Sequence, residues 1–176
     1  MIPEIGHFAL ILAALVALIL GTLPLIGAHQ NRMAWVAVAR PAASAMALLI
    51  TFSFVCLVNA FVTNDFSVVY VAQHSNSLLP IQYRVAAVWG GHEGSLLLWM
   101  LFLSWWAFSV AMLSRQLPAT MVARVLGTLG LVAFGFMLFI LVTSNPFERL
   151  LPAAAEGRDR TPLLQDFGLV IHPPLL

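Results

Sequence analysis

The chain has 176 residues, of which 61% are hydrophobic and only 9% are charged, and its mean hydropathy is +0.97. Soluble domains carry about 25% charged residues, so the composition indicates a membrane protein. All 8 basic residues are arginine, which excludes a P-loop lysine and a Schiff-base lysine. The formal net charge of +1 gives nucleic-acid binding no support.

Four apolar stretches have the length of about 20 residues that a membrane helix needs. They cover about residues 5–26, 42–62, 95–113 and 125–143. The first opens with Pro3 and Glu4 rather than with basic residues, so we interpret it as a retained helix and not as a signal peptide. We therefore expect an all-α, polytopic membrane protein. It would have four transmembrane helices, the start of a fifth at residues 172–176, and two sizeable extracytoplasmic segments, 63–94 and 144–174.

The distribution of arginine predicts the orientation of these spans. Arg32 and Arg40 follow the first span, Arg115 and Arg124 follow the third, and neither loop contains an acidic residue. By the positive-inside rule, both loops face the cytoplasm. The N-terminus and the two longer segments would then lie outside.

The connecting segments carry weaker signals. The β-branched and aromatic residues at 67–72 predict a short extended run, and residues 83–88 predict a short helix or an interfacial segment. Asn145 and Pro146 are expected to end the fourth long helix, because the residue before a proline is disfavoured in helical geometry.

An ionisable pair flanked by three glycines stands at the edge of the third span. The segment consists of Trp89, Gly90, Gly91, His92, Glu93, Gly94 and Ser95. Glycine lets another backbone or a flat ligand approach closely, and a histidine–carboxylate pair can move protons. The structural alternative is a helix start, at which Glu93 is stabilised by the helix dipole and Ser95 acts as the cap. The residues themselves are compatible with both the functional and the structural interpretation.

Residues 89–99 resemble the signature of the cytochrome c-type biogenesis haem lyase family (CcmF/NrfE-like). Further similar blocks follow in the expected order at residues 145–147, 157–159, 163–166 and 171–176, and Phe167 stands where a proline is expected. The similarity covers the whole chain, but family members are much longer. Residues 1–176 are therefore identified as the N-terminal membrane region of such a lyase, and we expect a fragment, a split-gene product or a truncated record.

The resemblance implies a part of the membrane haem lyase that ligates haem to apocytochrome c on the outer face of the membrane. It also implies the bacterial inner membrane as the location, with the outer segments in the periplasm. It implies b-type haem as the bound substrate or cofactor of the full assembly. The implied partners are the membrane, a haem chaperone, apocytochrome c with its thiol-handling factors, and the C-terminal part of the lyase. The fragment alone is expected to be inactive, because the second external histidine and the tryptophan-rich segment of the family lie further on.

The resemblance also implies roles for individual residues. His172 aligns with an external axial ligand of the haem iron, which imidazole commonly supplies; the alternative is a polar residue at the start of a helix. His92 is expected to contact haem or a partner. The surrounding partner and haem vicinity comprises Trp89, Gly90, Gly91, Glu93 and Gly94. The outer arginines either hold haem propionates or are solvated charges; they are Arg84, Arg149, Arg158 and Arg160.

Two other classes of protein are alternatives to the lyase. A multispan transporter subunit would need ionisable residues inside its spans, and the four stretches contain none beyond His7 at an edge. A non-catalytic structural or assembly subunit fits a chain that carries only part of the haem site.

Overall fold

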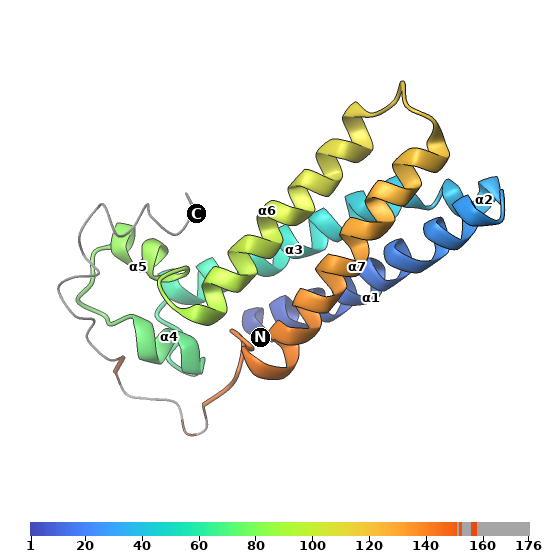
Figure 1. Ribbon diagram of the computed structural model, residues 1–176. Coiled ribbons are helices and arrows are strands. Elements are labelled where there is room, and N and C mark those ends of the chain that lie inside the picture. Colours follow the sequence, from blue (N-terminus) through green and yellow to red (C-terminus); the bar gives the residue numbers. More distant parts are fainter. Residues whose placement is uncertain (151, 153–155, 158–176) are drawn as a thin grey trace.

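The computed structural model describes residues 1–150, 152, 156 and 157 (Figure 1). These residues form seven helices and no strand, which confirms the all-α prediction for the described part. The helices are α1 (Ile2–His29), α2 (Met33–Val36), α3 (Ala39–Val62), α4 (Val69–His74), α5 (Ile81–Ala87), α6 (His92–Leu113) and α7 (Ala119–Thr143).

Four of the helical segments are long and apolar enough to cross a membrane. They are Ile2–His29, Met33–Val62, His92–Leu113 and Ala119–Thr143. Each contains one of the four predicted stretches, so the prediction of four membrane helices is confirmed. Helix α6 starts three residues earlier than expected, at His92, and α7 ends at Thr143, two residues before Asn145, as expected. The predicted start of a fifth span lies outside the described residues.

The long helices form a bundle in which α1 packs against α3 and α7, while α6 closes the far side by packing against the same two helices (Figure 1). Helices α1 and α7 approach each other through small residues. A Cβ atom placed on Gly130 would lie 2.9 Å from the backbone nitrogen of Gly21. Small residues at such a crossing allow the backbones to come close, and this packing holds membrane helices together where the hydrophobic effect cannot.

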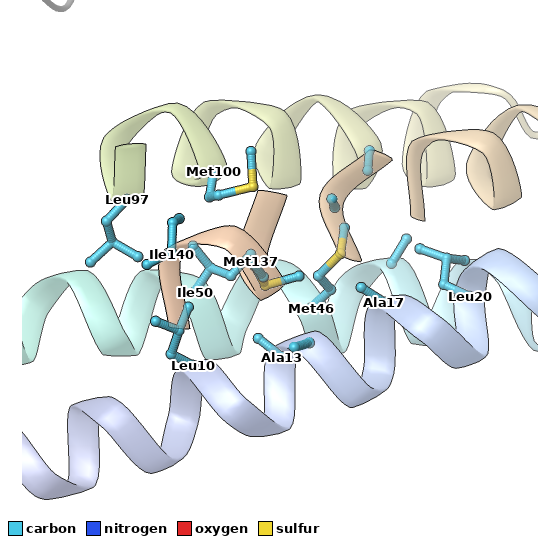
Figure 2. Packing of buried hydrophobic residues seen from close by; sticks show 14 of the residues in the cluster. Leu10, Ala13, Ala17, Leu20, Met46, Ile50, Leu97, Met100, Met137 and Ile140 are labelled. Carbon is cyan, nitrogen blue, oxygen red and sulfur yellow. The ribbon is translucent and has the colours of Figure 1, made fainter. Parts of the chain in front are cut away.

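The centre of the bundle is filled by aliphatic side chains and methionines from all four long helices (Figure 2). Leu10 and Leu20 of α1, Met46 of α3, Leu97 of α6 and Met137 of α7 are fully buried. Large apolar side chains also cover the outside of the bundle, including Phe8, Leu48 and Trp106. So much exposed apolar surface is unusual for a soluble protein and suits contact with lipid.

The two ends of the bundle carry different charges. The end with α2 and the α6–α7 connection holds Arg32, Arg40, Arg115 and Arg124. The opposite end, where α4 and α5 lie, holds all the acidic residues of the described part: Glu4, Asp65, Glu93, Glu148 and Glu156. This division agrees with the arrangement predicted from the loops. Which end faces the cytoplasm stays a prediction.

The predicted extended run at residues 67–72 is wrong. Residues 69–74 form helix α4, and only the preceding backbone is extended, where Val68 makes an isolated bridge with Arg149. The helical turn places Tyr70 and His74, four residues apart, on one face, and it buries Tyr70 against the turn before α6. Tertiary packing thus overrides the β-propensity of valine and tyrosine. The expected short helix near residues 83–88 is confirmed as α5.

Candidate functional site: the turn before helix α6

The turn between α5 and α6 is held in shape by a tyrosine from α4. The buried Tyr70 hydroxyl donates a hydrogen bond to the Val88 carbonyl oxygen at 2.9 Å and accepts one from the Gly91 backbone N–H at 3.1 Å. One phenol oxygen therefore satisfies a backbone acceptor and a backbone donor that frame the first glycines of the motif. A buried polar backbone group without such a partner would destabilise the fold.

Two glycines of the motif are needed because the chain packs closely against itself. A Cβ atom on Gly91 would lie 2.6 Å from Nε2 of His74 and 2.9 Å from the Tyr70 hydroxyl. On Gly94, a Cβ atom would overlap the Val88 carbonyl oxygen and lie 2.6 Å from the same hydroxyl. The approaching groups are thus the backbone and side chains of this chain, which gives Gly91 and Gly94 a structural reason of their own.

Helix α6 begins differently from the expectation. Gly91 occupies the N-cap position, so the expectation that Ser95 caps the helix is wrong. The Ser95 hydroxyl instead donates a 2.6 Å hydrogen bond back to the Trp89 carbonyl oxygen and closes the turn from within the helix. Glu93 lies in the first helical turn, where the positive end of the helix dipole stabilises a carboxylate.

His92 is the exposed member of this turn. Its ring stands nearly perpendicular to Phe139 of α7, with the ring centroids 6.3 Å apart. Trp89 is half-buried and packs against the core. Residues 89–94, with Gly90 between the tryptophan and the cap, therefore form a turn and the first residues of α6, held by the hydrogen bonds of Tyr70, and the His92 side chain is exposed.

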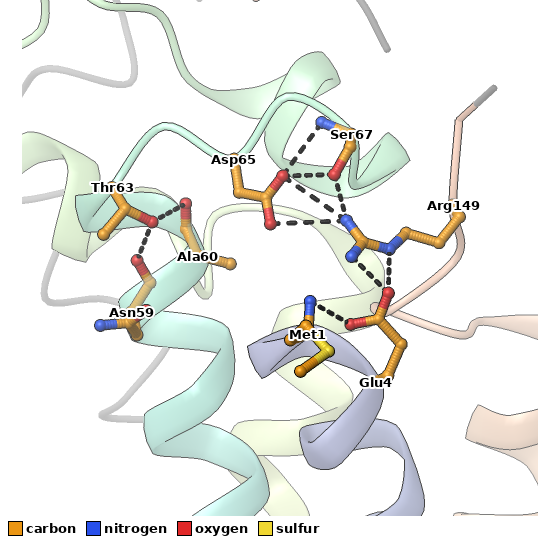
Figure 3. Close-up of polar contacts among 8 residues, drawn as sticks. All are labelled: Met1, Glu4, Asn59, Ala60, Thr63, Asp65, Ser67 and Arg149. Atoms are coloured by element: carbon orange, nitrogen blue, oxygen red, sulfur yellow. Dashed lines mark hydrogen bonds and ion pairs between the residues drawn. The ribbon is translucent and has the colours of Figure 1, made fainter. Parts of the chain in front are cut away.

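A second polar site at the same end joins three distant parts of the chain through Arg149 (Figure 3). Its guanidinium pairs with Glu4 of α1, to which Nε donates at 2.8 Å, and with Asp65, whose Oδ2 lies 3.4 Å from Nη1. It also contacts the Ser67 hydroxyl. Sequence reasoning missed this cluster, because its members lie up to 145 residues apart and no local pattern connects them.

The outer arginines of the described part are engaged by the protein itself. Arg84 donates to the carbonyl oxygens of Leu79 and Ser77, each at 2.7 Å, and to that of Val62 at 3.4 Å, while Arg149 makes the contacts above. These bonds account for most of the guanidinium donors of both residues. The geometry favours a structural role for Arg84 and Arg149 over the binding of haem propionates. Arg158 and Arg160 lie outside the described residues.

Glu156 is bound to the α4–α5 connection. Its carboxylate accepts hydrogen bonds from the Ser77 backbone N–H and from the Ser77 hydroxyl, both at 2.9 Å. These donors favour the ionised form and hold the pKa of Glu156 below its usual value of 4.5. A Cβ atom on the neighbouring Gly157 would collide with the Ser75 carbonyl oxygen, so Gly157 lies directly against that connection.

The described residues contain no cluster of metal-ligating side chains. Residues 1–150, 152, 156 and 157 contain no group of three or more histidine, cysteine or acidic side chains placed to hold a metal ion. Their histidines, His7, His29, His74 and His92, lie on separate elements or at opposite ends of one helix. His172, the predicted axial ligand, lies outside the described residues.

The chain is similar to known proteins. The family described as "Cytochrome C assembly protein" matches residues 89–176. The cytochrome c-type biogenesis protein CcmF of Pseudomonas aeruginosa is 55% identical over 100% of this chain, which corresponds to 27% of the relative. CcmF of Escherichia coli is 54% identical with the same coverage. NrfE of Haemophilus influenzae, a protein of the same description, is 47% identical over 100% of this chain and 28% of its own length.

A solved structure shares the fold. The structure of "Cytochrome c Heme Lyase CcmF" matches 99% of this chain and 27% of its own length, with a TM-score of 0.85 at 23% identity. The chain thus spans about a quarter of the length of the relatives it matches. The resemblance inferred from the motifs is confirmed, and the chain belongs to the cytochrome c assembly protein family.

Proposed function

We propose that residues 1–176 are the N-terminal membrane region of a haem lyase that ligates haem to apocytochrome c on the outer face of the bacterial inner membrane. The observation that carries the proposal is the 47 to 55% identity, along the whole chain, to proteins named for cytochrome c biogenesis. Because the chain spans only about a quarter of these relatives, the reaction belongs to the assembly that it forms with the remainder.

His172 is proposed as an axial ligand of a b-type haem, which is the substrate of the ligation. A neutral imidazole is a common ligand of haem iron, and two prolines directly after His172 restrict the backbone that carries it. The full assembly would receive haem from a membrane haem chaperone and present it to the thiols of apocytochrome c, which its thiol-handling factors keep reduced.

The turn at residues 89–94 is proposed as a docking surface next to the haem. Its support is the combination of a rigid base, formed by Tyr70 under Gly91 and Gly94, with an exposed imidazole at His92. Rigid placement reduces the entropy lost when a partner binds. In this arrangement Glu93 stabilises the start of α6, and His92 makes the contact.

A non-catalytic assembly role is the second candidate. It is favoured by the structural partners that the described part provides for Arg84 and Arg149, which leave these arginines little capacity for a ligand. In this case the chain would only position the remaining part of the lyase, and His172 would be a polar residue at the start of a helix.

Complementation of cells that lack their own lyase tests the proposal. Residues 1–176, the C-terminal remainder, and both as separate chains are expressed together with a reporter that carries a CxxCH motif, and covalent haem is stained on a denaturing gel. We expect no holocytochrome from either piece alone and restored holocytochrome from both, because membrane helices associate without a covalent link. Covalent haem from residues 1–176 alone would contradict the claim that the reaction requires the C-terminal remainder. If the two separate chains accumulate but form no holocytochrome, while the same two parts joined in one chain do, the proposed assembly from separate chains is contradicted.

A further inference from the structure

The arginine-rich end of the bundle contains a cavity between helix α2, the start of α3 and the α6–α7 connection. Its volume is about 470 Å³. Arg40 and Arg115 line it together with apolar side chains such as Val36 and Leu117. Because the long helices end here, the cavity lies at the level where a membrane helix meets the lipid headgroups.

The two arginines at this cavity are not neutralised by any acidic residue of the described part. Arg40 is half-buried and donates one hydrogen bond, 3.0 Å long, to the Ser114 carbonyl oxygen. A guanidinium has five donors, so most of its capacity remains available to an anion. Arg115 is exposed, and the described residues give it no hydrogen bond or ion pair.

A second, apolar groove adjoins this cavity. It has a volume of about 390 Å³ and runs between α6 and α7. Its walls include Trp106 and Val110 on one side and Met121 and Val125 on the other, and it shares Leu117 and Val122 with the arginine cavity. A positively charged pocket at the end of the bundle therefore adjoins an apolar groove that runs along α6 and α7.

We propose that these two adjoining hollows bind one anionic glycerophospholipid. The lipid phosphate would pair with Arg40 and Arg115, since guanidinium and phosphate form charge-assisted hydrogen bonds, and an acyl chain would lie in the α6–α7 groove. Basic pockets between membrane helices recognise anionic headgroups in this way. The proposal does not depend on the haem chemistry and concerns the opposite end of the bundle.

Native mass spectrometry of the purified chain tests the headgroup. The probes are phosphatidylglycerol and phosphatidylethanolamine with identical acyl chains, offered at equal concentration. We expect retention of phosphatidylglycerol over phosphatidylethanolamine. Each arginine near a membrane surface strengthens anionic binding by about 1 kcal/mol, or roughly fivefold. Arg115→Gln should therefore lower retention roughly fivefold, and Arg40→Gln/Arg115→Gln roughly 25-fold.

A matched control distinguishes binding at this site from general electrostatic attraction of anionic lipid to the arginine-rich end. Arg32 and Arg124 lie at the same end of the bundle but line neither hollow. Arg32→Gln/Arg124→Gln removes the same charge and should change retention less than about twofold, since surface charges beyond direct contact are screened. Equal losses in the two double variants, or equal retention of the two wild-type lipids, would overturn the proposal. The helical circular dichroism signal and the melting temperature check that each variant is folded.

The groove is tested by filling it. Met121→Trp should lower phosphatidylglycerol retention, whereas Leu48→Trp, on an exposed face of α3 away from both hollows, should not. An excess of inorganic phosphate should fail to displace the lipid, because phosphate lacks the acyl chain. Displacement by phosphate would overturn the lipid assignment, as would loss of the lipid when the C-terminal part of the lyase is co-purified.

Discussion

Gly94→Ala is the sharpest test of the turn before α6. In most helices this change is stabilising, because glycine costs about 0.5–1 kcal/mol relative to alanine. At Gly94 the new Cβ atom would overlap the Val88 carbonyl oxygen and lie 2.6 Å from the Tyr70 hydroxyl. Overpacking of this kind costs about 1–3 kcal/mol, and here the obstructing atom belongs to the backbone and cannot rotate away. We expect a net loss of about 1–2 kcal/mol in the free energy of unfolding.

Gly135→Ala is the matched control. A Cβ atom on Gly135, in α7, meets nothing within 4 Å, so this variant should be as stable as the parent chain or up to about 1 kcal/mol more stable. Unfolding of both variants is followed by circular dichroism in mixed micelles of increasing dodecyl sulfate content. Tyr70→Phe/Gly94→Ala removes the hydroxyl but not the carbonyl, so the cost of the alanine should persist in that background. A Gly94→Ala chain as stable as Gly135→Ala would refute the close packing of this turn.

Three further outcomes are expected. The hydrogen bonds between Glu156 and Ser77 should be fully formed above the usual carboxyl pKa of 4.5 and should be lost as the pH falls through the lower pKa of Glu156 in the folded chain. Hydrogen exchange at the Ser77 amide measures this loss, and Glu156→Gln should abolish its pH dependence. Reporter fusions after Asn31 and after Gln116 should be active only as cytoplasmic reporters; active periplasmic phosphatase at either point would reverse the proposed orientation. In the reconstituted lyase, His172→Ala should lower the yield of holocytochrome c and alter the haem spectrum, and free imidazole should partly restore both. His92→Ala should lower the yield without changing the spectrum. An unchanged spectrum and yield in His172→Ala would return His172 to a structural role.

Much of the candidate site could be located in the sequence but not explained by it. The segment from Trp89 to Ser95 stands out by its glycines and its ionisable pair, and the motif order identifies the family. The sequence did not reveal why Gly91 and Gly94 are needed. The groups that press on them are the Val88 carbonyl, which the folded turn brings back onto Gly94, and the side chains of Tyr70 and His74, about 20 residues earlier. The β-prone residues around Tyr70 also predicted an extended run, and burial beneath the turn made them helical.

The sequence by itself determined the class of protein, the four membrane helices and the family. Lipid offers no hydrogen bonds to the backbone, so a long apolar stretch has to form a helix whatever its neighbours are. Only the tertiary structure decided which polar groups meet at the ends of the bundle. Arg149 joins Glu4 and Asp65 across as many as 145 residues, and Arg40 reaches Ser114 across 74. Such contacts depend on which helices pack side by side, and helix packing is set by the fit of small and large side chains over the whole bundle, which no local pattern records.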